Sequence, residues 1–123
     1  MRVKDAVGRF GEDVGAEFLG RAGVLVLQRN WRCREGELDI VARDGDELVF
    51  CEVKTRSGAG FGTPAEAVTA AKARRLRVLA ARWLAEERGD RVEGHGCSGI
   101  RFDVIGVVRG PDGVTVEHLR GVL

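Results

Sequence analysis

The 123-residue sequence lacks the features that would place it in a membrane or outside the cell. No apolar run approaches the roughly 20 residues that a membrane-spanning helix needs. The first residues, MRVKDAVGRFGED, contain no apolar core of a signal peptide. The three cysteines, Cys33, Cys51 and Cys97, are an odd number without a spaced framework, which favours reduced thiols. We therefore predict a cytoplasmic protein with no membrane partner, and its length suits a single domain over residues 1–123.

Two further absences limit the chemistry that the sequence suggests. Cys33, Cys97 and His95 do not have a recognised zinc-ligand spacing, so we do not expect a zinc site there. The chain also has little net charge, only +1 at pH 7. This value neither requires nor excludes a polyanionic partner, so local clusters of charge have to decide the question.

Residues 5–22 are predicted to form a helix, because Phe10, Val14, Phe18 and Ala22 recur at every fourth position. Glycines inside this stretch each cost a helix about 1 kcal/mol relative to alanine. There are four of them, namely Gly8, Gly11, Gly15 and Gly20. We therefore expect this helix to pack closely against another element.

The remaining elements follow from alternation and capping signals. Strands are predicted over 24–29, 36–43 and 47–55, the last two joined by the turn DGD. A helix is predicted over 64–87, with Thr63 as its N-cap, Pro64 at its first position and Glu66 completing a capping box. IRFDVIGVV and VTVEHL, separated by PDG, read as a closing pair of strands. The fold class is α/β, a mixed sheet flanked by helices in the order α-β-β-β-α-β-β.

The hairpin over residues 36–55 brings acidic residues together. A two-residue or four-residue loop at its turn places Asp39 opposite Glu52 and Glu37 opposite Lys54, all on one face, whereas a three-residue loop would shift the partners by one. The other face is predicted to be apolar, and it would contain Leu38, Ile40, Val49, Cys51 and Val53.

Opposed carboxylates 4 Å apart would repel by about 4 kcal/mol at an effective dielectric constant near 20. A proton on one acid, splaying of both into water, or a divalent cation between them would relieve this repulsion. A solvated charged face is the alternative reading. The apolar runs LDIV and VFCEV around Asp39 and Glu52 favour a metal site instead, with Lys54 as a neighbouring cation.

The spacing D-x12-E-V-K from Asp39 to Lys54 resembles the PD-(D/E)xK nuclease signature, found in restriction endonucleases and archaeal Holliday-junction resolvases. Over nearly the whole chain, the sequence resembles the uncharacterised bacterial YraN-like family, whose members are predicted to share a restriction-endonuclease-like fold. The segments that carry this resemblance are GEDVGAEFL, NWRCREGELDIVARDGDELVFCEVKTR, FGTPAEAV, the helix with Lys72, and RFDVI. Leu38 replaces the proline of the signature, a tolerable change because proline supplies no ligand. The resemblance implies a metal-dependent nuclease, with structured or branched DNA as its suggested substrate.

The resemblance also implies a role for individual residues. Asp39 and Glu52 would bind Mg²⁺ or Mn²⁺, with the Val53 carbonyl as a third ligand, and Lys54 would orient the attacking water and offset phosphate charge. Glu12 resembles the helix acid that often joins such sites, although it also reads as a surface charge. Glu37 is either an outer ligand or a cross-strand partner of Lys54. Asp103, in RFDVI, has no assigned role.

Basic residues near these acids are candidate contacts to nucleic acid, with DNA favoured over RNA. Lys72 lies at the centre of the apolar stripe of the second helix, so we expect it to reach into the cleft. Arg32, Arg34 and Arg56 lie at the ends of the acid-bearing strands and are candidate phosphate contacts. Trp31 and Phe61 could stack on bases, but core or loop packing is the preferred reading for both.

Two alternatives to a nuclease stay open at this point. One is a nucleic-acid-binding module of the same fold without turnover, and the other is an interaction protein whose acidic face is structural. The resemblance to branched-DNA resolvases, which cut two strands symmetrically, also predicts a homodimer that would supply a second active site.

Overall fold

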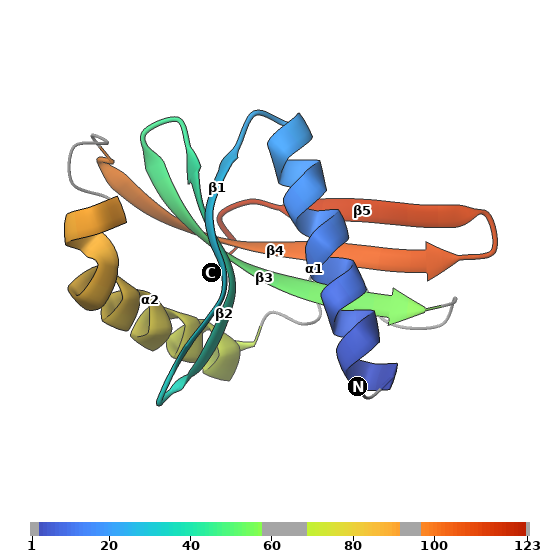
Figure 1. Ribbon diagram of the computed structural model, residues 1–123, viewed down its shortest axis with the longest axis horizontal. Helices are drawn as coiled ribbons and strands as arrows, with labels where there is room; N and C mark the ends of the chain where they lie inside the picture. Colours follow the sequence, from blue (N-terminus) through green and yellow to red (C-terminus); the bar gives the residue numbers. More distant parts are fainter. Residues whose placement is uncertain (1–2, 58–68, 92–96, 123) are drawn as a thin grey trace.

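The computed structural model describes residues 3–57, 69–91 and 97–122 (Figure 1). These residues form a five-stranded sheet and two helices, in the predicted order α-β-β-β-α-β-β. The elements are α1 (Val3–Arg21), β1 (Leu25–Cys33), β2 (Gly36–Asp44), β3 (Glu47–Ser57), α2 (Ala70–Arg91), β4 (Gly99–Gly110) and β5 (Gly113–Leu119). The predicted fold class, a mixed sheet flanked by helices, is therefore confirmed.

The strands follow one another across the sheet in chain order, from β1 to β5. Neighbouring strands are antiparallel except β3 and β4, which run parallel. A parallel pair needs a crossover connection, and α2 lies within it. Figure 1 shows α1 crossing β3, β4 and β5, while α2 lies on the other side of the sheet.

Each helix covers its own apolar cluster. The cluster on the α1 side is built around Leu19, Ile40, Val49, Cys51 and Ile105. The cluster on the α2 side contains Trp31, Leu38, Val41, Leu48, Phe50, Leu76, Leu79, Ala80 and Trp83. The two sides use different residues of the same strands, as expected for a sheet buried on both faces. Within residues 3–57, 69–91 and 97–122, neither helix combines the length and apolar character that crossing a bilayer requires.

The first helix lies close to the sheet at two of its four glycines. A Cβ atom added to Gly11 would lie 1.7 Å from Thr55 Oγ1, and one added to Gly15 would lie 3.5 Å from a Val53 methyl group. The expectation of close packing is thus confirmed for these two positions, whereas Gly8 and Gly20 have open space around them. Glycine at position 11 lets α1 approach β3 more closely than any other residue would allow.

The second helix begins later and ends later than predicted. Thr69 lies outside the helix, and its Oγ1 accepts a hydrogen bond from the Lys72 N–H at 3.1 Å, so Thr69 is the N-cap of α2. The prediction of one helix starting at residue 64 was wrong, since Ala70 is its first residue; the predicted cap at 63–66 lies outside the described residues. The helix then continues to Arg91, four residues beyond the predicted end at 87.

At one position of β1 and β2, the regular alternation of side chains between the two faces of the sheet is broken. Ile40 packs on the α1 side, whereas Leu38 packs on the α2 side, although strict alternation would put them on the same face. The prediction that Leu38 and Ile40 share a face was therefore wrong. The break lies at Asp39 and at the facing position of β1, where Asn30 has a left-handed backbone with φ 54°. Asp39 thus lies at the break in alternation, directly beyond the last paired position of β2 and β3, Ile40–Cys51.

Candidate functional site

The hairpin that carries the acids has the predicted register. Its paired positions run from Asp44–Glu47 at the turn to Ile40–Cys51. The ladder stops there, although both strands continue. In place of the next ladder bond, Asp39 Oδ2 accepts a hydrogen bond from the Val53 N–H at 2.8 Å. The Asp39 carboxylate therefore occupies the gap where β2 and β3 separate.

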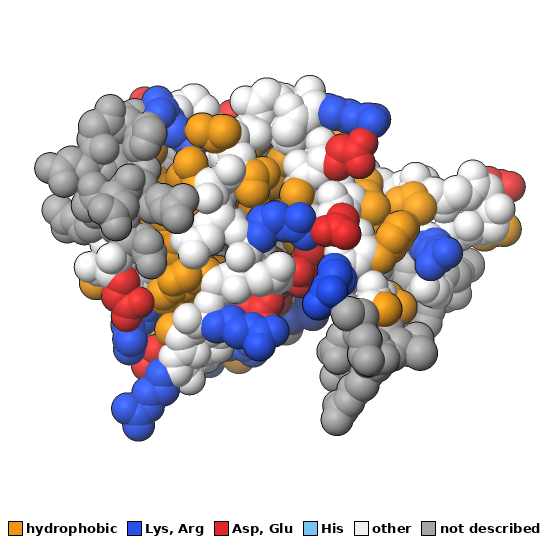
Figure 2. All heavy atoms as spheres, in the orientation of Figure 1, with side chains coloured by type: hydrophobic (Ala, Val, Ile, Leu, Met, Phe, Trp, Pro, Cys, Tyr) orange, Lys and Arg blue, Asp and Glu red, His pale blue; other side chains and the backbone are white. Residues whose placement is uncertain are grey.

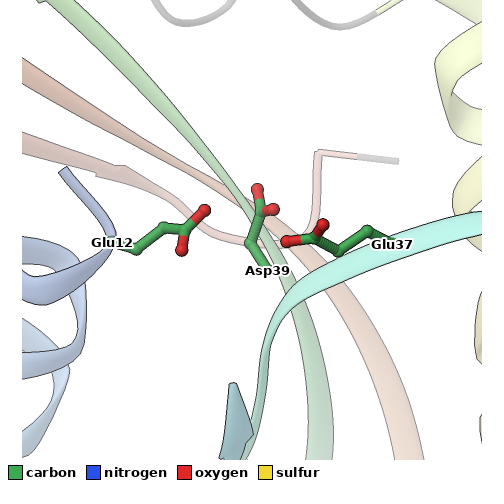
Figure 3. A group of neighbouring side chains, drawn as sticks. All are labelled: Glu12, Glu37 and Asp39. Atoms are coloured by element: carbon green, nitrogen blue, oxygen red, sulfur yellow. The ribbon is translucent and has the colours of Figure 1, made fainter. Parts of the chain in front are cut away.

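Three carboxylates meet in this gap, and we call them the acid centre: Glu12, Glu37 and Asp39. One carboxylate oxygen of each lies within 4.8 Å of one oxygen of each of the others, and all three residues are half-buried. Figure 3 shows Glu12 on α1 and Glu37 on β2 pointing toward Asp39 from opposite sides. Oxygen donors at this separation could hold a divalent cation. Among the described residues, this is the one group of ligand-type side chains with that geometry.

The environment of the acid centre raises pKa values. Burial, followed by the charges of Glu12, Glu52 and Glu37, raises the pKa of Asp39 to about 7, although the Val53 hydrogen bond acts against this shift. Burial and the charge of Glu37 also raise the pKa of Glu12, which Arg29 and a hydrogen bond from Asn30 partly offset. Asp39 and Glu12 therefore bind a proton more strongly than isolated carboxyls do. A bound cation would relieve the charge repulsion that contributes to these raised pKa values.

The fourth acid, Glu52, is held by a lysine instead. Lys72 Nζ lies 3.1 Å from Glu52 Oε1, and both side chains are less than a quarter exposed. The prediction that Lys72 reaches into the cleft fits this contact. Contact with the Lys72 amine and then burial lower the pKa of Lys54, while the charges of Glu52 and Asp39 act in the opposite direction. Glu52, Lys54 and Lys72 thus form a second group beside the acid centre.

The structure groups the acidic residues differently from the metal-ligand set that the resemblance implies. Asp39 is grouped with Glu12 and Glu37, whereas Glu52 is paired with Lys72. Val53 contacts Asp39 through its N–H. In a strand, the N–H and C=O of one residue point to the same side, so the Val53 carbonyl is also directed toward the edge where Asp39 lies.

Comparison with known proteins assigns the chain to a family. A family model described as "Uncharacterised protein family UPF0102" matches residues 11–107. The chain belongs to family UPF0102. A UPF0102 protein of Frankia alni is 62% identical over 122 residues, which cover 98% of this chain and 97% of that protein. A UPF0102 protein of Acidothermus cellulolyticus is 56% identical over 124 residues, covering 97% and 94% of the two chains. One of Streptomyces griseus is 54% identical over 123 residues, covering 99% of each.

The prediction of the YraN-like family is thereby confirmed as family UPF0102. The matched residues 11–107 contain the complete acid centre together with Glu52, Lys54 and Lys72. The family description names no activity, so the function of this UPF0102 chain has to be argued from the side chains themselves.

The three arginines of this UPF0102 chain that the sequence suggested as phosphate contacts lie at the end of β1, on the β1–β2 turn and on β3. Arg32 is 77% exposed, and its Nε lies 2.9 Å from Glu37 Oε2. Glu37 is therefore paired with Arg32, and the alternative pairing with Lys54 was wrong. Arg34 is exposed on the turn, and Arg56 is half-buried on β3. Figure 2 shows basic side chains beside acidic ones across the middle of one face of the molecule.

The second helix fixes the position of this turn. Arg82 Nη1 contacts both carboxylate oxygens of Glu35, at 3.0 and 3.2 Å. Trp83 Nε1 donates to Gln28 Oε1 at 2.9 Å. At Gly36, an added Cβ would lie 3.3 Å from Arg75 Nε. These contacts hold the β1–β2 hairpin, and with it Glu37, against α2.

Other residues considered from sequence have structural positions. Trp31 is buried in the α2-side cluster, so the core reading is confirmed. Cys33 and Cys97 are half-buried against the same cluster, while His95 lies outside the described residues, as does Phe61. One of the three residues considered for a zinc site, His95, therefore lies outside the described part of the chain.

Sequence reasoning missed the partners of Asp103. This carboxylate is completely buried and accepts hydrogen bonds from Arg101, from His118 at 2.6 Å and from the Gly121 N–H at 2.9 Å. Burial alone would raise the pKa of Asp103, but these hydrogen bonds outweigh it and hold the pKa at about 2. An acid inside the run RFDVI was the only available signal; Arg101 lies two residues away in the same run, but His118 and Gly121 are 15 and 18 residues away.

Proposed function

We propose that this UPF0102 protein is a divalent-metal-dependent nuclease that hydrolyses phosphodiester bonds in nucleic acid. The observation that carries the proposal is the convergence of Glu12, Glu37 and Asp39 in a half-buried gap of the sheet. Clustered acids with raised pKa values are costly in a folded protein and are typical of functional sites.

The donors in this gap fit Mg²⁺ or Mn²⁺. Both ions favour carboxylate and carbonyl oxygens, and a site with few protein ligands leaves room for water and phosphate. Asp39 would be the central ligand, with Glu12 and Glu37 beside it and with Glu52 and the Val53 carbonyl on β3. When bound, the ion would acidify a water molecule and polarise the phosphate.

The lysines supply the complementary charge. Lys54 lies two residues after Glu52 on β3, and Lys72 of α2 is the main cause of its lowered pKa. An ammonium group at this place would steady the negative charge that develops on phosphate during hydrolysis. A lysine with a lowered pKa can also orient the water by hydrogen bonding. In this proposal Lys54 contacts the reacting groups, and Lys72 positions Glu52.

The substrate proposal rests on the cations around the gap. Arg32 of β1, Arg34 of the β1–β2 turn and Arg56 of β3 would contact phosphates and position the strand without reading its sequence. The similarity of the motif to branched-DNA resolvases suggests structured DNA as the first substrate to try. If two strands are cut, a homodimer would supply two centres, and sedimentation with and without a four-way junction measures this directly.

A substrate panel tests the proposal. Purified protein with Mg²⁺ or Mn²⁺ is incubated with single-stranded, duplex, flap and four-way DNA and with single-stranded RNA. We expect cleavage of at least one substrate by the wild type and none by Asp39→Ala. Glu17→Gln is a matched control, because Glu17 is an exposed acid of α1 paired with Arg21. Equal cleavage by wild type and Asp39→Ala would mean that a contaminant or another site is responsible.

One observation favours a second candidate, a nucleic-acid-binding module without turnover. Glu52 already has a cation partner in Lys72, which could hold it away from a metal ion. This candidate predicts salt-dependent binding to the same nucleic acids, because phosphate contacts release counterions. Under all metal conditions it predicts no cleavage.

A further inference from the structure

The first turns of α2 have a one-sided charge. Residues 70–81 contain the cations Lys72, Arg74, Arg75 and Arg77 and no acid. The N-terminal end of a helix carries a partial positive charge, so acids stabilise the first turn and cations destabilise it. The start of α2 therefore departs from a rule that favours helix formation, and such departures are expected where a surface serves a function.

Three of these cations have no acidic partner, and we call them the arginine surface: Arg74, Arg75 and Arg77. All three are exposed, and none forms an ion pair among the residues whose side chains the structure describes. Arg82, further along the same helix, contacts two carboxylates. Arg74 and Arg77 also lie one turn apart, where like charges repel. Positive charge is therefore concentrated on this part of a chain whose net charge is only +1.

The arginine surface adjoins the turn that leads into the acid centre (Figure 1). A Cβ atom added to Gly36 would lie 3.3 Å from Arg75 Nε, and Gly36 directly precedes Glu37. One turn earlier on the helix, Lys72 contacts Glu52 at 3.1 Å. A polyanion bound across the arginine surface would therefore lie close to the acid centre.

The other residues of the exposed helix face indicate which polyanion fits. Ala71, Val78 and Ala81 are exposed there. A helix that binds to a membrane surface buries large apolar side chains in the lipid, and this face has none larger than valine. The planar guanidinium group of arginine instead matches the geometry of a phosphate group. The composition thus favours a phosphate backbone over a lipid surface.

We propose that the arginine surface binds the sugar–phosphate backbone of nucleic acid outside the acid centre and directs the bound strand toward Asp39. Arg74, Arg75 and Arg77 would contact phosphates and would read no bases. The inference rests on the proposed function for the identity of the polyanion, and it adds a binding surface on α2 to the arginines of β1, the β1–β2 turn and β3.

Binding measured without cleavage tests this surface. Fluorescence anisotropy in the presence of EDTA reports binding of labelled duplex DNA, single-stranded DNA and single-stranded RNA. The test variant replaces all three arginines of the surface by glutamine, which has a similar helix propensity. The control variant has the same net charge, because it replaces three exposed arginines elsewhere: Arg9→Gln, Arg21→Gln and Arg120→Gln.

We expect the wild type and the control to bind at least one probe, and the test variant to bind it at least about tenfold more weakly at physiological salt. Each phosphate contact adds about 0.9 to the slope of log affinity against log salt, so this slope should fall by about 2 to 3 in the test variant. The melting temperature should not fall, because the substitutions remove repulsion at the start of α2.

Equal affinity of the test variant and the control would overturn the proposal, and so would the absence of binding by the wild type. A second variant, Arg74→Gln/Arg77→Gln, leaves Arg75 in place against the β1–β2 turn and therefore keeps the hairpin intact. It should bind at least about fivefold more weakly than the wild type with an unchanged melting temperature. Wild-type affinity in this variant would also overturn the proposal.

Two further results separate this inference from its alternatives. Binding to vesicles that contain anionic phospholipid, without binding to any nucleic acid, would overturn it and assign the surface to a membrane. If no substrate is cleaved but the test variant loses binding, the nuclease proposal fails and the arginine surface stands. If the wild type cleaves a substrate and the test variant binds it normally, the nuclease proposal stands and the arginine surface fails.

Discussion

Asp39 and Asp103 are both acids in the sheet, yet their surroundings are opposite. Asp39 has one hydrogen bond from Val53 and three acidic neighbours, and its pKa is raised to about 7. Asp103 has Arg101, His118 and the Gly121 N–H around it, and its pKa is lowered to about 2. An acid whose partners are all supplied by the chain stabilises the fold. An acid surrounded by like charges is suited to a partner from outside the chain.

The largest effect should come from breaking the Asp103 cluster. Asp103→Ala would leave the Arg101 and His118 side chains without the carboxylate that they share. Breaking a buried ion pair from one side costs about 3 to 5 kcal/mol. We expect a loss of this order in the free energy of unfolding, measured by urea denaturation at pH 7. A loss below about 1 kcal/mol would show that Asp103 contributes little to stability.

Removing a cation beside the acid centre should lower activity, whereas removing one from the Asp103 cluster should lower stability. Lys54→Ala should lower phosphodiester cleavage at least about 100-fold, the size expected when a charge-stabilising group is removed from an active site. Its stability should change little, because Lys54 forms no ion pair within 4 Å among the described residues. Arg101→Ala should instead lower stability, since Arg101 contacts Asp44, Glu47 and Asp103. Cleavage by Lys54→Ala within a few-fold of wild type would remove Lys54 from the site.

The pH dependence of stability should have opposite signs for the two acids. The native state keeps a proton on Asp39 that the unfolded chain releases near pH 3.8, so in metal-free protein its contribution to stability falls as the pH rises from about 4 to about 7. The full difference would be worth about 4 kcal/mol, and partial solvent screening reduces the expected change to about 2 kcal/mol. Asp103 is deprotonated more easily in the native state, so its contribution is lost as the pH falls from about 4 to about 2.

Urea denaturation of metal-free protein between pH 4 and pH 8 measures the first of these effects. Asp39→Asn should remove most of the decline over this range, because asparagine does not titrate. An Asp39→Asn profile parallel to the wild type would assign the decline to other groups and would weaken the comparison.

The sequence predicted those parts of the site that depend on local rules. The turn DGD and the alternation around it predicted the register from Asp44–Glu47 to Ile40–Cys51. The glycines of the first helix predicted its close approach, which Gly11 makes against Thr55. These features follow from neighbouring residues and from side-chain size.

The sequence-based predictions that were wrong concern features that depend on contacts between distant residues. The change of faces at Asp39 coincides with the left-handed Asn30 on the neighbouring strand, and nothing in a strand-like run such as LQRNWRC predicts it. Thr63 and Thr69 have the same capping chemistry, so local rules could not choose the start of α2 at Ala70. The grouping of Glu12 and Glu37 with Asp39, in place of Glu52, follows from the way α1 and the β1–β2 hairpin are packed.

The central claim is that the acid centre is completed by a divalent cation bound through Asp39. Titration calorimetry with Mn²⁺ on the metal-free wild type, Asp39→Asn and Glu17→Gln tests it most directly. We predict one binding site in the wild type and in Glu17→Gln, no binding in Asp39→Asn, and a gain in stability of about 2.7 kcal/mol at a Mn²⁺ concentration 100 times the Kd. Binding to Asp39→Asn with wild-type affinity would place the cation elsewhere and contradict the account.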